Sequence, residues 1–240
     1  MICAHFCFSH VLIFIHGFWA NGSIWRPFIE YFSKRNFDCV AIDLREGLDM
    51  RKASFKDYVN KVRAIARKDD IIIGHSMGGL IVQKVAEEII IKGGIAICPA
   101  PPKGIKFGKR MLLSSIKYLP KVIINKPFKT SFSFAKKFFL NCVEDARSVY
   151  KKLEVEPANI AYELMMSKIE VDERKVKCPL LFIATKDDKA CKPEMVKRIA
   201  EKYDAEFIIE EGCHWIFDNW QSIADKIQSF IIRLYEDKLT

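Results

Sequence analysis

The most informative stretch of this 240-residue chain is Ile71-Ile72-Ile73-Gly74-His75-Ser76-Met77-Gly78-Gly79. A short β-branched run leads into a serine flanked by glycines, and an apolar helical pattern follows at once. We therefore predict a strand, a sharp turn and a helix. The turn strains the backbone at Ser76, so its neighbours Gly74 and Gly78 must be small. The serine hydroxyl then stands beside a helix N-terminus, where N–H groups and the helix dipole favour an anion.

Strand-like and helical stretches alternate along much of the chain. Strands are predicted at 11–15, 39–43, 70–74, 95–98, 179–184 and 205–209, with a short additional strand at 2–8. Helices are predicted at 54–66, 80–91, 193–203 and 223–234, the first opened by a capping box of Ser54 and Asp57. This alternation predicts an α/β fold, in which a mostly parallel sheet of about seven strands carries helices on both faces.

The composition further limits the class of protein that this chain can be. Half of the residues are apolar, which is enough for one sizeable core. No apolar run reaches the roughly 20 residues of a transmembrane helix. The apolar start has no basic residue before it and leads into the strand at 11–15, so we expect an unprocessed cytoplasmic protein. The eight cysteines are scattered, which predicts buried thiols and no disulfide framework. Cys3, His5, Cys7 and His10 match no zinc spacing, and we expect no metal site.

The glycine-flanked serine between a strand and a helix resembles the nucleophile turn of the α/β-hydrolase family, and the resemblance covers nearly the whole chain. It implies the α/β-hydrolase fold, Ser76 as nucleophile, no cofactor, and a triad in the order serine, acid, histidine. A serine at this position argues against dehalogenases and epoxide hydrolases, for which the resemblance would demand an aspartate.

The resemblance places the base in the loop after the last strand. His214 is the only histidine after Ser76, and Glu211-Gly212-Cys213-His214-Trp215 is similar to the family's G-x-G-H-W stretch, with a cysteine replacing the second glycine. We therefore expect His214 to take the proton of the serine.

The acid is expected at the end of the strand before that. The family pattern is G-x-x-D, and here Thr185-Lys186-Asp187-Asp188 follows the strand. Thr185 stands at the glycine position, which makes Asp188 the acid. Asp187 is the alternative; if it is not the acid, it is a loop-capping or solvated charge.

The oxyanion donors are expected in two loops. The resemblance assigns them to the backbone N–H groups of Phe18, after the strand at 11–15, and of Met77, directly after the nucleophile. Gly17 lets the backbone approach the reacting atom, and His16 is expected to brace its loop. The substrate is expected to contact Gly17, Trp19, His75 and Trp215.

One region breaks the alternation. Residues 101–177 are helical or irregular, and the resemblance places a helical cap here, inserted into a core made of 1–100 and 178–240. This stretch holds 17 basic and 8 acidic residues, whereas the rest of the chain is neutral; within 101–143 there are ten basic residues and no acidic one. Three interpretations stay open. In the first, the lysines are solvated around an acyl pocket; in the second, they settle on an anionic membrane surface. In the third, they bind an anionic partner or substrate, such as an acyl carrier or a phosphate-bearing ester.

These observations together predict a serine hydrolase of the carboxylesterase or lipase type. The substrate would be a small-molecule ester or thioester, with acyl lipids and carrier-bound acyl groups as alternatives. Carbon–carbon or amide hydrolysis and acyl transfer would use the same triad, and a non-catalytic binding protein could keep the fold. A nucleic-acid partner is disfavoured, because the charge is confined to the cap and no binding motif occurs. The sequence indicates no oligomeric state.

Overall fold

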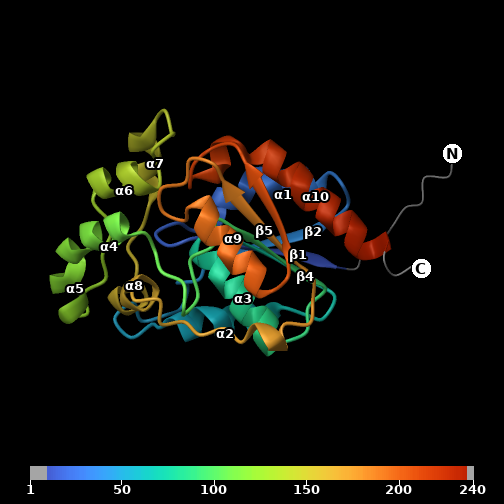
Figure 1. The fold of residues 1–240 in the computed structure, drawn as a ribbon, viewed down its shortest axis with the longest axis horizontal. Coiled ribbons are helices and arrows are strands. Elements are labelled where there is room, and N and C mark those ends of the chain that lie inside the picture. Colours follow the sequence, from blue (N-terminus) through green and yellow to red (C-terminus); the bar gives the residue numbers. More distant parts are fainter. Residues whose placement is uncertain (1–9, 237–240) are drawn as a thin grey trace.

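A computed structural model describes residues 10–236, and within them the chain forms one parallel sheet of six strands (Figure 1). The strands are β1 (Val11–Ile15), β2 (Asp38–Ile42), β3 (Ile71–His75), β4 (Gly93–Ile97), β5 (Leu180–Thr185) and β6 (Glu206–Glu210), in the order β2-β1-β3-β4-β5-β6. The predicted α/β fold is confirmed, with six described strands in place of about seven. The predicted strand at 2–8 lies outside the described residues.

Three of the four interior strands of the sheet are buried on both faces. Every residue of β3, β4 and β5 is buried, whereas the edge strands β2 and β6 keep part of their surface in water. The sequences of β3, β4 and β5 are correspondingly continuous apolar runs, as is typical of parallel sheets covered by helices. The register pairs Ile15 with Gly74 and His75 with Ile97. The loops that follow β1, β3 and β4 therefore leave the sheet at the same edge.

Helices cover both faces of the sheet. On one face α1 (Arg26–Ser33) packs with α10 (Trp220–Glu236); α2 (Phe55–Ile65) packs with α3 (Met77–Glu88) on the other. The face with α2 and α3 also carries α9 (Pro193–Lys202). The hydroxyl of Tyr203, the residue directly after α9, donates to Gln83 of α3. Short 3-10 helices η1 (Gly22–Trp25) and η4 (Ile216–Asp218) precede α1 and α10. The capping box predicted for α2 is present at Ser54 and Asp57.

The residues between β4 and β5 form no strand of the sheet. We call residues 101–177 the insert. It contains α4 (Lys109–Ser115), η2 (Ile116–Tyr118), α5 (Leu119–Ile123), α6 (Phe132–Phe138), α7 (Ala146–Lys152), α8 (Ala158–Met165) and η3 (Glu173–Lys175). Helices α4 to α8 gather at one end of the molecule, at the left of Figure 1, and the last turns of α10 lie toward the other. No helix within residues 10–236 is long and apolar enough to cross a membrane.

Candidate active site

The turn between β3 and α3 has the strained geometry predicted from its glycines. Ser76 has φ +56° and ψ −116°, outside the regions that side chains favour. A Cβ at Gly74 would lie 2.2 Å from the carbonyl oxygen of Gly78, and a Cβ at Gly78 would lie 2.4 Å from that of Ile15. Only glycine fits at either position, because helix α3 begins in backbone contact with the sheet.

Ser76 begins an unbroken chain of hydrogen bonds. Its hydroxyl donates to Nε2 of His214 over 2.9 Å, and Nδ1 of His214 donates to Oδ2 of Asp188 over 2.7 Å. The other carboxylate oxygen of Asp188 accepts the backbone N–H groups of Ala190 and Cys191 at 2.7 and 2.8 Å. Both His214 and Asp188 are buried. The arrangement suits a serine whose proton is withdrawn by an oriented imidazole.

The competing aspartate lies elsewhere. Asp187 is exposed, and its described partners are bonded through its backbone. The structure therefore brings Asp188, and not Asp187, against His214.

Two residues at the ends of sheet strands hydrogen-bond to the loop that carries His214. The hydroxyl of Thr185, at the end of β5, donates to the carbonyl oxygen of Cys213 over 2.9 Å. Nε2 of His75, at the end of β3, lies 2.8 Å from the carbonyl oxygen of His214 and donates to it. Burial lowers the pKa of His75 well below 6.5, and the neighbouring His214 adds to this shift. A neutral His75 with its proton on Nε2 therefore positions the loop.

The insert also bonds to the loop that carries His214. The backbone N–H of Trp215 donates to the carbonyl oxygen of Phe139 over 3.0 Å, and Cys213 forms a disulfide with Cys142. Asn141 donates to the carbonyl oxygen of Asp187 over 3.1 Å. Three insert residues, Phe139, Asn141 and Cys142, thus reach the loop of the base or the loop of the acid.

The expectation of no disulfide is wrong for this pair of cysteines. Sequence spacing could not reveal it, because Cys142 and Cys213 are 71 residues apart and meet only when the insert folds back over the sheet edge. Among the described residues the free cysteines are Cys39, Cys98, Cys178 and Cys191.

One group of side chains has the composition of a metal site. Ligand atoms of Cys98, Asp188 and His214 lie within 4.8 Å of one another. However, Asp188 and His214 are hydrogen-bonded to each other, and burial raises the pKa of the Cys98 thiol well above its ordinary value. These groups fit a proton-transfer chain better than a cation, since metal binding requires a thiolate.

The two predicted oxyanion donors face the same space as Ser76. Within residues 10–236 neither the Phe18 nor the Met77 N–H donates a hydrogen bond. Both residues line a cavity together with Ser76. A Cβ at Gly17 would lie 3.0 Å from Cβ of Ser76, so glycine allows this loop to approach the nucleophile.

The buried His16 has the bracing contacts expected of it. Its Nδ1 donates to the carbonyl oxygen of Gly17 over 2.8 Å, and its Nε2 accepts the backbone N–H of Leu44 over 3.1 Å. The ring therefore joins the loops after β1 and β2, and both of its nitrogens are occupied.

The sequence pattern does not reveal the role of two insert glutamates, Glu154 and Glu156, beside Trp19. The N–H of Trp19 donates to Glu156 over 3.2 Å, and the Trp19 carbonyl accepts the N–H of Glu154 over 2.8 Å. The Trp19 indole donates to the carbonyl oxygen of Phe128 over 3.0 Å. Glu156 is fully buried and pairs with Arg45 at 2.6 Å. The insert thus anchors the residue next to Phe18, and no local sequence signal marks a buried glutamate of this kind.

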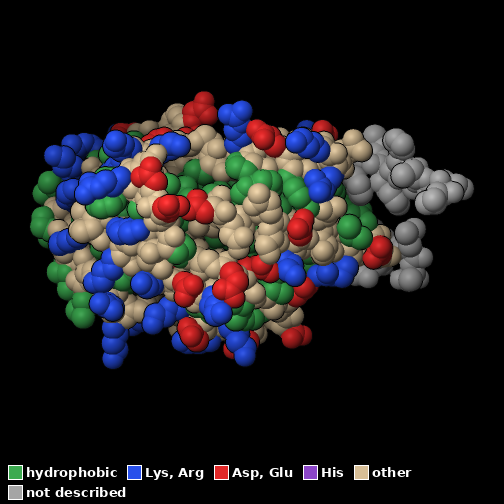
Figure 2. Space-filling model, turned by 90° about the horizontal axis from the view of Figure 1, so that it is seen from above, with side chains coloured by type: hydrophobic (Ala, Val, Ile, Leu, Met, Phe, Trp, Pro, Cys, Tyr) green, Lys and Arg blue, Asp and Glu red, His purple; other side chains and the backbone are tan. Residues whose placement is uncertain are grey.

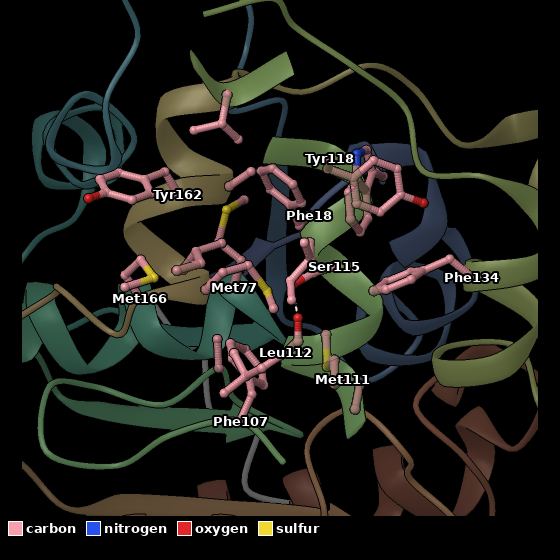
Figure 3. A pocket seen from close by; sticks show the side chains of 18 of the residues that line it. Phe18, Met77, Phe107, Met111, Leu112, Ser115, Tyr118, Phe134, Tyr162 and Met166 are labelled. Carbon is pink, nitrogen blue, oxygen red and sulfur yellow. Dashed lines mark hydrogen bonds between the residues drawn. The ribbon is translucent and has the colours of Figure 1, made fainter. Parts of the chain in front are cut away.

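A cavity of about 380 Å³ opens beside Ser76 and runs into the insert. Its walls are mostly apolar, and among the described residues Lys106 is the one charged side chain that lines it. Figure 3 shows Phe18 and Met77 between the side chains that α4 and α6 contribute, such as Met111 and Phe134, and those of Tyr162 and Met166.

The four predicted substrate contacts are divided between two spaces. Trp19 lines the large cavity. Gly17, His75 and Trp215 instead line a smaller adjoining hollow of about 40 Å³, which Trp19, Ser76 and His214 also border. All four residues thus lie within the immediate surroundings of the nucleophile.

Comparisons with known proteins agree with the fold described above. The model of the alpha/beta hydrolase family matches residues 12–226. A carboxylesterase structure from Nitrososphaera gargenis has a TM-score of 0.74 at 20% identity, covering 95% of this chain and 92% of that one. The monoacylglycerol lipase of Paleococcus ferrophilus has a TM-score of 0.68 at 18% identity, covering 93% and 94%.

A curated relative matches over a shorter stretch. The pimeloyl-[acyl-carrier protein] methyl ester esterase of Aliivibrio salmonicida is 32% identical over 78 residues. This match spans 31% of the chain and only 30% of that relative's length.

Proposed function

The chain belongs to the alpha/beta hydrolase family, and we propose that within it this protein is a serine esterase that cleaves carboxylic esters or thioesters through an acyl-enzyme. The observation that carries the proposal is the hydrogen-bonded series Ser76–His214–Asp188, with distances of 2.9 and 2.7 Å, beside an apolar cavity. Relatives and structural neighbours named as carboxylesterase, lipase and methyl ester esterase support the same chemistry.

The reaction follows from this geometry. Ser76 Oγ attacks the ester carbonyl while Nε2 of His214 takes its proton, and Asp188 holds the imidazole in the tautomer with Nδ1 protonated. The N–H groups of Phe18 and Met77 stabilise the oxyanion. The tetrahedral intermediate collapses as His214 protonates the leaving alcohol. Water activated by the same imidazole then hydrolyses the acyl-enzyme and releases the acid.

The insert supplies the acyl site in this proposal. We propose that residues 101–177 act as a cap over the core formed by 1–100 and 178–240. The cavity beside Ser76 is walled largely by insert residues, with aromatic, methionine and aliphatic side chains. Such a surface binds an apolar acyl group and excludes water from the acyl-enzyme. Substrates should therefore carry an acyl chain of several carbons.

Hydrolysis of p-nitrophenyl esters from acetate to palmitate tests this proposal, with Ser76→Ala as the control. We expect the rate to rise with chain length and to vanish in the variant, while circular dichroism shows an unchanged fold. A fluorophosphonate probe should label the wild-type protein and not Ser76→Ala, whatever the substrate, because it reports the activated serine itself. Wild-type protein that neither hydrolyses any ester nor reacts with the probe would overturn the proposal.

A further inference from the structure

The end of the insert exposes an unusual number of apolar side chains. Residues Leu113, Ile116, Leu119, Ile123, Ile124 and Met166, which we call the apolar rim, are between 45 and 78% exposed. They come from α4, η2 and α5 and from the residues that directly follow α5 and α8. Soluble proteins seldom gather exposed aliphatic side chains of this size in one place, and such patches mark interaction sites.

Part of the apolar rim lies at the mouth of the cavity. Leu113, Ile116, Leu119 and Met166 are exposed and also line the cavity beside Ser76. Helices α5 and α8, which frame this mouth, are in contact. Ile123 and Ile124 do not line the cavity and extend the apolar surface outward from it. The rim is thus continuous with the proposed acyl site.

Basic side chains lie next to the apolar rim. Residues 101–143 contain ten basic side chains and no acidic one. Of these ten, Lys103 alone forms an ion pair with a described residue, Glu170. Along α4 to α5 the basic positions Lys109, Arg110, Lys117 and Lys121 alternate with the rim residues. Figure 2 shows lysines, arginines and apolar side chains together at this end of the molecule.

We propose that the apolar rim and the basic side chains around it dock on an anionic lipid surface. A lipid layer offers phosphate groups and acyl chains in adjoining planes, so that one contact satisfies both the lysines and the isoleucines. An acidic protein partner would also pair with the lysines, but a lipid layer adds a continuous hydrocarbon phase for Ile123 and Ile124. In the docked state the cavity mouth faces the acyl chains, and acyl esters enter from the lipid; this second statement rests on the proposed esterase function.

Co-sedimentation of the full chain with lipid vesicles tests the docking without relying on catalysis. We expect binding to vesicles of phosphatidylcholine and phosphatidylglycerol to exceed binding to phosphatidylcholine alone by about tenfold or more, and to weaken as salt is added. Ser76→Ala should bind equally well. Absence of binding to the anionic vesicles, with ester hydrolysis intact, would overturn the docking and leave the proposed function standing.

Matched variants separate the rim from general surface effects. Ile123→Ser with Ile124→Ser should weaken vesicle binding by about tenfold, because apolar surface is lost from the contact. The control, Ile90→Ser with Ile232→Ser, removes exposed isoleucines outside the insert and should bind like wild type. Both should hydrolyse a short soluble ester normally, which also shows that they fold.

A second pair of variants tests the charge. Lys109→Gln with Arg110→Gln should weaken binding to the anionic vesicles, whereas Lys197→Gln with Arg198→Gln, an exposed basic pair on α9, should not. Equal losses in both pairs would contradict a specific surface. Binding to an acidic acyl carrier protein in place of vesicles would also overturn the proposal.

Discussion

Trp215 donates its backbone N–H to the carbonyl oxygen of Phe139 over 3.0 Å, and this bond joins the loop of His214 to the insert. The disulfide between Cys142 and Cys213 joins the same two segments. On the opposite side, Thr185 and His75 hold the loop to the ends of β5 and β3. The proposed base is therefore positioned by the insert and the sheet together.

Loss of the disulfide should loosen this arrangement. Cys142→Ser is expected to lower the free energy of unfolding by about 2–4 kcal/mol, since the crosslink closes a long loop in the unfolded chain. It should also lower kcat, because His214 follows the crosslinked residue. Thermal melting and ester hydrolysis under oxidising conditions measure both effects. Cys39→Ser, at a free cysteine, is the control. A wild-type protein that melts at the same temperature with and without dithiothreitol would contradict this prediction.

Asp188 and Asp187 should differ sharply in their effect on turnover. Asp188→Asn is expected to lower kcat/KM by about 10⁴-fold, because an amide cannot hold the imidazole in the required tautomer. Asp187→Asn leaves the hydrogen bond to His214 in place and should stay near wild type. Steady-state kinetics on one ester decide between them, and a larger loss in Asp187→Asn would assign the acid to the other aspartate.

Thr185 should act through the loop and not through the substrate. Thr185→Val leaves the Cys213 carbonyl without the hydroxyl that now donates to it, at an expected cost of about 1–3 kcal/mol in stability. Displacement of His214 should lower kcat by about tenfold to a hundredfold while KM changes little. Thr185→Ser keeps the hydroxyl and should restore kcat. Failure of the serine variant to restore it would show that the methyl group, and not the hydrogen bond, matters.

His75 should make the protein less stable in mild acid. Its pKa is lowered well below 6.5 in the folded protein by burial, so below this pH the unfolded chain binds a proton that the folded chain does not. The free energy of unfolding therefore falls as the pH drops below 6.5, and this contribution vanishes above it. Urea denaturation at about pH 7.5 and about pH 5 should show a smaller drop for His75→Gln than for wild type. An equal drop would exclude His75 as a source.

Filling the cavity should shorten the preferred acyl chain. Ala161 of α8 is buried and lines the cavity, so Ala161→Phe places a ring in the proposed acyl site. We expect kcat/KM for long-chain esters to fall at least about tenfold while acetate is hydrolysed as before. Equal losses on all esters would indicate a general disturbance of the site.

The sheet and its turns were predictable because their signals are local. All six described strands appear as short runs rich in apolar residues, and the glycines around Ser76 mark a backbone contact that no larger residue allows. Since parallel strands end at one edge, residues after three different strands could be expected to meet. The structure does bring Ser76, Asp188 and His214 within hydrogen-bond distance of one another in series.

The insert was predictable only in outline. Its charge and helical character are visible in the sequence, but its attachment to the core depends on contacts between distant residues. Glu156 meets Arg45 and Trp19, and Cys142 meets Cys213, only because the folded insert returns to the sheet edge. A buried glutamate and an exposed one look alike in a single sequence. The composition of the insert therefore could not distinguish a glutamate that anchors it to the core from one that is exposed at the surface.

The contacts of Trp19 limit how the insert of such a chain can change in evolution. Its backbone and indole are held by Phe128, Glu154 and Glu156, and these two glutamates also neutralise Arg45. A chimera that took its insert from another hydrolase would lose these carboxylates, leave the Arg45 guanidinium with Asp43 as its one described carboxylate partner, and release the loop beside Phe18. Recombination should therefore preserve function only when the insert and the loops after β1 and β2 come from one parent, so these segments must evolve together.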